Sequence, residues 1–181
     1  MGICGGRTIS ERPTGPAQPK VRSIFPDAAD SSFDAELHRA VRGEDFTFAG
    51  TVTLAKVVEV YDGDTVRLVF RYRGALVQYR VRMLGYDSPE MKPPRNQPNR
   101  EAEVAAARAA RAALELIALN KVLVADLGAF DKYGRVLATV YLTNDLEARD
   151  GAVCVNEWMV SQGHGVSYAG GTKAPYAQPA E

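Results

Sequence analysis

Hydrophobic and polar residues alternate along three consecutive stretches in the first half of the chain. The stretches are rich in β-branched and aromatic residues, and this pattern is typical of strands with one buried face. They cover residues 46–61, 64–74 and 75–84. Arg73 and Gly74 separate the last two stretches and favour a tight turn. We therefore expect three strands, of which the second and third form a hairpin.

The second half of the chain begins with a loop and a helix pattern. Residues 91–99 hold three prolines and predict a loop, and the alanine-dense residues 100–120 predict a helix of about five turns. Two further strands are expected at 121–128 and 136–142, and a short helix at 155–163. Five strands with one helix after the third and another after the fifth have the element order of an OB-fold. The predicted fold class is therefore α+β, a five-stranded OB-fold β-barrel with flanking helices.

The two ends of the chain have a different composition. Residues 1–22 are rich in glycine, proline and polar residues without a hydrophobic period, and this composition indicates disorder. We expect 1–45 to be a largely disordered segment with a short helix within 32–43. The folded domain is expected at 46–170 and a flexible tail at 171–181.

Composition and charge narrow the class of protein only slightly. Apolar residues make up 46% of the chain, as in a globular protein, and 22 basic residues balance 22 acidic ones. Residues 62–135 carry a surplus of four basic side chains, which is a weak indication of a phosphate partner. Cys4 and Cys154 are the cysteines of the chain and form no disulfide framework, which suits a reducing compartment. Without a transmembrane run or an apolar signal core, we expect an intracellular protein, cytoplasmic or membrane-associated.

The first residues, "MGICGGR", resemble a signal for lipid modification, which would attach the protein to a membrane. Gly2 and Cys4 have the arrangement of a dual acylation signal, with myristoyl on the glycine and palmitoyl on the cysteine. Gly6 departs from this pattern, since Ser or Thr is preferred at that position. The alternative is a flexible glycine-rich start without modification.

Charged residues gather in three stretches, "YDGDTV" at 61–66, "YRVRMLGYDSPE" at 79–90 and "FDKYGRVLA" at 130–138. Phosphodiester hydrolysis needs carboxylates that hold a hard cation, arginines that pair with phosphate oxygens, and an acid that takes a proton from water. The three stretches supply two arginines and three acids that match these needs. They are Asp64, Arg82, Asp87, Glu90 and Arg135.

Each of these residues also has an ordinary structural explanation. Asp64 lies in a "DGD" sequence that is common in turns, and Asp87 and Glu90 would cap a short turn before a proline. Arg82 would lie on the polar outer face of a strand, and "DKYG" is typical of a type I turn. The spacing of the residues leaves both explanations open.

Four short motifs occur in a particular order along the chain, and together they are more specific than any one of them alone. "YDGDTV", "RMLGYDSPE", "DKYGRVLA" and "VNEWMVSQG" follow one another with a helix-length interval between the second and third. Across roughly residues 52–165 the chain resembles the staphylococcal nuclease (thermonuclease) family. The resemblance implies a five-stranded barrel and a Ca2+-dependent nuclease. Such an enzyme would hydrolyse DNA and RNA, preferably single-stranded, with little sequence preference, and would leave 3′-phosphate ends.

The resemblance also implies a role for each acid. Asp64 and Asp87 would bind calcium through their carboxylates, and Ser88 through its backbone carbonyl. Glu90 would hold the attacking water and act as the candidate general base.

Basic and aromatic residues would contact the substrate. The resemblance implies that Arg82 and Arg135 clamp the scissile phosphate, and that Lys132 and Tyr133 contact the neighbouring terminal phosphate. Where the family carries a pair of tyrosines that stack on the base, this chain offers Tyr168, displaced by one position. Base stacking is therefore expected to be reduced.

The resemblance leaves one rival function. Its fold also occurs in degenerate repeats that bind nucleic acid or protein without catalysis, and these typically lose the acids or the arginines. This chain retains all five, which favours the enzyme. The family has a third helix, but residues 171–181 are too short and too rich in proline and glycine to form it.

Overall fold

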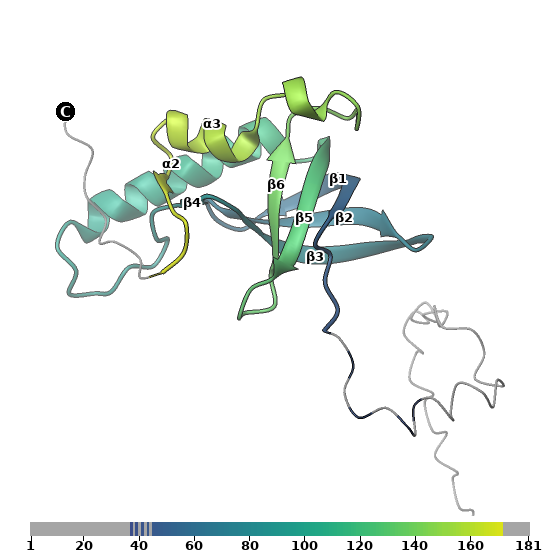
Figure 1. The fold of residues 1–181 in the computed structure, drawn as a ribbon. Coiled ribbons are helices and arrows are strands. Elements are labelled where there is room, and N and C mark those ends of the chain that lie inside the picture. The colour runs from purple at the N-terminus through teal and green to yellow at the C-terminus, as the bar shows by residue number, and fades with distance from the viewer. Residues whose placement is uncertain (1–36, 38, 40, 42, 44, 172–181) are drawn as a thin grey trace, which may run out of the picture. The chain divides into compact units, whose positions relative to one another are not determined.

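The computed structural model describes residues 37, 39, 41, 43 and 45–171 (Figure 1). Gly2 and Cys4, the residues of the expected acylation signal, and residues 172–181 lie outside this part. Most of the short helix expected within 32–43 also falls outside it, although Leu37 and Arg39 have helical backbone.

Five strands close into a barrel, as the sequence predicted, and their order around it is β1-β2-β3-β6-β5 (Figure 1). All neighbouring pairs are antiparallel except β3 and β6, which are parallel. The strands are β1 (Thr51–Val60), β2 (Thr65–Tyr72), β3 (Ala75–Met83), β5 (Val122–Phe130) and β6 (Val136–Tyr141). Helices α2 (Arg100–Ala118) and α3 (Val155–Ser161) flank the barrel, and a 3₁₀ turn, η1 (Arg149–Gly151), precedes α3. The fold is the predicted α+β class, while the boundaries expected for the domain, 46–170, remain a prediction.

The hairpin between β2 and β3 turns where the sequence indicated. Tyr72 pairs with Ala75, and both residues between them have positive φ, 48° at Arg73 and 84° at Gly74. Positive φ at both central positions defines the turn type whose twist matches the two strands.

The first strand begins later than predicted. Residues 46–50 precede β1 and turn at Gly50, which has a φ of 80°. Phe48 is buried because its ring packs edge-on against Phe70 and Tyr79, with centroids 5.3 and 4.8 Å away. Its apolar and aromatic character therefore reflects core packing, which resembles a strand pattern in the sequence.

Helix α2 packs against the barrel through small residues. Its buried apolar side chains are spaced three or four apart, as expected for one face of a helix. They are Ala107, Ala110, Leu114 and Ala118. A side chain at Gly63 would place its Cβ 2.8 Å from that of Ala110 and 2.7 Å from that of Ser88. The loop between β1 and β2 therefore lies tightly between α2 and the residues after β4.

Two very short strands were not predicted. β4 (Tyr86–Asp87) pairs antiparallel with β7 (Val166–Ser167), and the backbone N–H of Tyr168 donates to the carbonyl of Gly85 at 2.9 Å. Two-residue strands carry too little alternation to be recognised in a sequence. This pairing returns the chain after α3 to the end of β3.

No helix in the described part of the chain is long and apolar enough to cross a membrane.

Candidate active site

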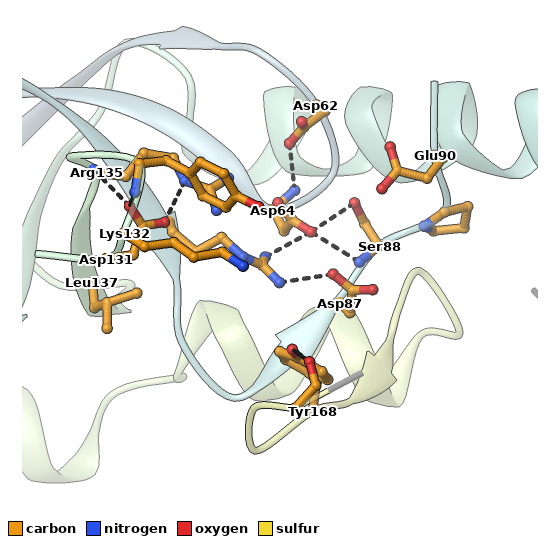
Figure 2. A pocket seen from close by; sticks show the side chains of 14 residues that line it. Asp62, Asp64, Asp87, Ser88, Glu90, Asp131, Lys132, Arg135, Leu137 and Tyr168 are labelled. Carbon is orange, nitrogen blue, oxygen red and sulfur yellow. Dashed lines mark hydrogen bonds and ion pairs between the residues drawn. The ribbon is translucent and has the colours of Figure 1, made fainter. Parts of the chain in front are cut away.

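The charged residues singled out in the sequence line a single cavity of about 640 Å³ at one end of the barrel (Figure 2). All nine candidate residues outside the N-terminal segment are among its lining. The full lining is Asp62, Asp64, Arg82, Asp87, Ser88, Pro89, Glu90, Asp131, Lys132, Tyr133, Arg135, Leu137, Tyr168 and Gly171.

Strand register explains why positions far apart in the sequence converge. Thr65 of β2 pairs with Arg82 of β3, and Arg82 pairs in turn with Leu137 of β6. The N–H of Met83 also donates to the carbonyl of Asp64 at 2.8 Å. The start of β2, the end of β3 and the start of β6 therefore meet at the same place.

Arg82 lies between two carboxylates. Its Nη1 is 2.6 Å from Oδ2 of Asp64, and its Nη2 donates to Oδ1 of Asp87 at 2.8 Å and to the carbonyl of Tyr86 at 3.1 Å. The residue is only 9% exposed, so a location on the open strand face is excluded. Among the buried side-chain atoms that the structure describes, Nη1 is the one that makes no hydrogen bond of normal geometry despite its ion pair. A buried N–H donor without a well-formed hydrogen bond can donate to the oxygen of a bound anion.

Asp64 is fixed by donors at both carboxylate oxygens. Its Oδ1 accepts from the Thr65 hydroxyl at 3.0 Å, and its Oδ2 accepts from the backbone N–H and the hydroxyl of Ser88, each at 3.0 Å. Ser88 therefore holds Asp64 through its N–H and its hydroxyl, while the role expected for its carbonyl as a calcium ligand stays a prediction.

Asp62, the first acid of the "DGD" sequence that is common in turns, was not a candidate in the sequence. Burial, followed by the negative charge of Asp64, raises the pKa of Asp62 to about 6. Its Oδ1 accepts the N–H of Asp64 at 3.1 Å, so the two carboxylates share one tight loop. The repeated acid in "DGD" was the signal for this second carboxylate, since acids two apart across a glycine come close in a turn.

Asp131, also interpreted as a turn residue, orients Arg135. Its Oδ2 lies 2.7 Å from Nε of Arg135, and its Oδ1 accepts the backbone N–H groups of Tyr133 and Arg135 at 2.8 and 2.9 Å. Burial alone would raise the pKa of Asp131, but these hydrogen bonds and the charge of Arg135 hold the pKa below its usual value. Nη1 of Arg135 reaches Oγ1 of Thr65 at 3.3 Å.

Three further candidates lie at the rim of the cavity. Tyr133 is 71% exposed, with the cationic groups of Lys132 and Arg135 at 5.0 and 5.5 Å from its ring centroid. Tyr168 lines the same cavity as Arg135, and its hydroxyl donates to the carbonyl of Gly171 at 2.6 Å. The β4–β7 pairing therefore brings Tyr168 to the cavity in spite of its displaced position in the sequence.

The oxygen atoms of the cavity fit a hard divalent cation. The carboxylates of Asp64 and Asp87 converge on the same guanidinium, so positive charge is stabilised between them, and the carboxylate of Asp62 lies in the same loop as Asp64. In the described part of the chain, no three His, Cys, Asp or Glu side chains form a cluster that could bind a metal. A cation would therefore depend on two carboxylates, the Ser88 carbonyl and water, a donor set that calcium tolerates.

The fold and the cavity together define a barrel protein with a charged site at one end. The family model for staphylococcal nuclease homologues matches residues 80–179, a little over half of the chain. The chain belongs to this family. The match includes Arg82, Asp87, Glu90 and Arg135 but begins after Asp64, whose place in the site rests on the structure. A comparison with curated proteins finds no match.

Proposed function

We propose that this chain is a calcium-dependent nuclease that hydrolyses phosphodiester bonds in DNA and RNA with little sequence preference and leaves 3′-phosphate ends. One observation carries the proposal: two arginines and the acids Asp64, Asp87 and Glu90 line the same cavity. Membership of the family supports nuclease chemistry in general, and the residues of the cavity support the particular form proposed.

The two arginines bind the scissile phosphate. Arg135 keeps its Nη atoms near the cavity because Asp131 pairs with its Nε, and a guanidinium matches two phosphate oxygens at once. Arg82 exchanges part of its pairing with Asp64 and Asp87 for the phosphate. Calcium held by these two carboxylates and the Ser88 carbonyl would supply positive charge against the phosphate oxygens.

Glu90 accepts the proton from the attacking water. Its side chain is exposed and lies at the edge of the cavity beside Ser88 (Figure 2). A carboxylate within reach of a bound water serves as a general base, and a contact through water allows the distance to vary.

The lining also accounts for broad specificity. Its cationic groups, Arg82, Lys132 and Arg135, suit phosphate, and phosphate contacts carry no sequence information. Tyr168 offers a ring face on which any base can stack, provided that the base is unpaired, while Tyr133 and Lys132 contact the neighbouring terminal phosphate. The proposal is therefore a preference for single strands without a preference for sequence.

Cleavage of a labelled single-stranded oligonucleotide tests the proposal. Purified protein is incubated with the DNA or RNA form in calcium, in magnesium or in excess chelator. The expected result is cleavage in calcium, a sharp drop in magnesium and none in chelator. A 3′-phosphate product should change mobility after treatment with a phosphatase.

The Glu90→Gln variant, prepared in the same way, is the control for a contaminating nuclease. Equal cleavage by this variant or full cleavage in chelator contradicts the proposal. Binding of the oligonucleotide without any cleavage would favour the rival, a non-catalytic binding module of the same fold.

A further inference from the structure

One of the most deeply buried carboxylates lies outside the cavity lining. Glu103, in the first turn of α2, is only 2% exposed. Acidic side chains are rarely buried to this degree unless hydrogen bonds satisfy both oxygens. A buried acid beside a candidate active site therefore calls for a role that a surface residue could not fulfil.

Glu103 holds both ends of the proline-rich loop. Its Oε1 accepts the backbone N–H of Glu90 at 3.0 Å, and its Oε2 accepts a hydrogen bond from the side-chain amide of Gln97. Its own N–H donates to the carbonyl of Asn99 at 3.0 Å, which ties the residue to the start of the helix. The positive end of the helix dipole further stabilises a carboxylate in this first turn.

The short segment that carries Glu90, residues 88–90, is held by hydrogen bonds to two different parts of the chain. The N–H of Ser88 donates to Asp64, Pro89 has no N–H and a fixed φ, and the N–H of Glu90 donates to Glu103. Every backbone donor of this segment is therefore accepted by a carboxylate. One of these carboxylates belongs to the proposed metal site, while the other belongs to a helix that takes no part in the chemistry.

We propose that Glu103 is the positioning residue for Glu90. It fixes the backbone of Glu90 and so directs its carboxylate toward the cavity. The inference rests on the proposed function, in which Glu90 takes the proton. A misplacement of about 1 Å at a reacting group lowers the rate on the order of a hundredfold, so the loss of this anchor should be visible in kcat.

A double-mutant cycle separates positioning from general stability. Glu103→Ala should lower kcat on the order of tenfold or more with little change in KM, while Glu90→Gln should lower it further. In the Glu90→Gln background, Glu103→Ala should cause almost no additional loss, because the group that it positions is already neutral. Equal losses in both backgrounds overturn the proposal.

An exchange of partners tests the geometry in case Glu103→Ala does not fold. In Glu103→Gln, the amide Nε2 would face Gln97, so Gln97 must turn its own oxygen toward it, and the hydrogen bonds at this position lose the charged acceptor that strengthens them. The second substitution Gln97→Glu supplies an acceptor and should recover most of the lost kcat. Recovery of the thermal midpoint without recovery of kcat overturns the proposal.

Hydrogen exchange at the Glu90 amide measures the anchor without reference to activity. The amide should be protected in the wild type and in the double exchange variant, and unprotected in Glu103→Ala or, should that variant not fold, in Glu103→Met, which fills a similar space without an acceptor. Unchanged protection overturns the proposal even if the protein is active. If the wild type is inactive, the proposed function fails, while this measurement still decides whether Glu103 fixes the backbone of Glu90.

Discussion

The carboxylate of Asp131 binds both the side chain and the backbone of Arg135. Its Oδ2 lies 2.7 Å from Nε of Arg135, and its Oδ1 accepts the backbone N–H of Arg135 at 2.9 Å. Because Asp131 engages Nε, the Nη atoms remain directed at the cavity, where Nη1 reaches Thr65. A turn of five residues thus holds a long, flexible side chain in one orientation before any substrate arrives. Such preorganisation limits the entropy lost when the guanidinium pairs with phosphate.

Asp131→Asn should lower kcat on the order of tenfold with little change in KM. The amide retains one oxygen for the backbone N–H groups but turns a donor toward Nε of Arg135, so the orientation of the guanidinium is lost. Steady-state kinetics on a single-stranded oligonucleotide measure both constants. Asp145→Asn is the matched control, since Asp145 also accepts a backbone N–H in a turn but lies outside the cavity lining. An equal effect of both variants would show that loss of charge, and not orientation, is responsible.

Arg135→Lys should lower kcat about a hundredfold, corresponding to about 3 kcal/mol, and leave KM nearly unchanged. Lysine retains the charge but loses the pair of aligned donors that follow the phosphate oxygens as negative charge develops. The thermal midpoint should remain close to that of the wild type, because the residue is half-buried at a turn and contributes little to the core. A raised KM with unchanged kcat would instead mean that Arg135 only binds substrate. Unfolding of the variant would mean a structural role.

Asp62→Asn should stabilise the protein at neutral pH and have little effect near pH 4, both measured in chelator. The folded protein raises the pKa of Asp62 from 3.8 to about 6, so it binds the proton more tightly than the unfolded chain does. Stability is therefore lost as the pH rises from about 4 to about 6, and asparagine, which does not ionise, avoids this loss. Its Oδ1 can still accept the N–H of Asp64.

Thermal unfolding at pH 4 and pH 7.5 measures this effect. The difference in midpoint between Asp62→Asn and the wild type should grow by roughly a few degrees between the two values of pH. A constant difference across this range would contradict a raised pKa at Asp62.

Regular alternation made the barrel predictable, and irregular packing set the limits of the prediction. Residues 64–84 alternate cleanly, and the Arg73-Gly74 turn adopts the conformation that its sequence favours. Phe48 was assigned to a strand because an apolar residue that plugs a core has the same pattern as a strand residue. The pairing of β4 with β7 joins residues about 80 positions apart through two residues each, and no local pattern signals such a contact.

The site was predictable where the residue type is demanded by the chemistry. Arginines and acids suited to phosphate and calcium were found from their sequence motifs, and the structure brings them to one cavity. Asp131 and Glu103 escaped notice because their roles depend on which backbone N–H groups they face. A turn aspartate and a helical glutamate are ordinary in a sequence, and only the fold shows what they accept.

Tyr168→Ala should weaken binding of single-stranded substrate by about 1–3 kcal/mol, the range found for stacking of one base on an aromatic ring. The effect should appear in KM, or directly in binding to an oligonucleotide by the inactive Glu90→Gln protein. Tyr168→Phe keeps the ring and loses only the hydrogen bond to Gly171, so it should bind nearly as the wild type does. Equal affinity for all three proteins would remove Tyr168 from the binding site.

Asp64→Asn and Asp87→Asn should both abolish calcium-dependent cleavage but differ in their effect on the fold. In chelator, Asp64→Asn should lower the free energy of unfolding by about 1–3 kcal/mol. The carboxylate accepts donors from Thr65 and Ser88 at its two oxygens, and an amide must turn its own donor toward one of them. Asp87→Asn should lower the free energy of unfolding by less, because the amide oxygen can still face Nη2 of Arg82.

The thermal midpoint of the wild type should rise on addition of calcium, as ligand linkage requires, and the midpoints of the two variants should not change. Equal destabilisation by the two substitutions would show that the contacts of Asp64 with Ser88 add nothing to stability. A calcium shift that persists in both variants would place the cation elsewhere.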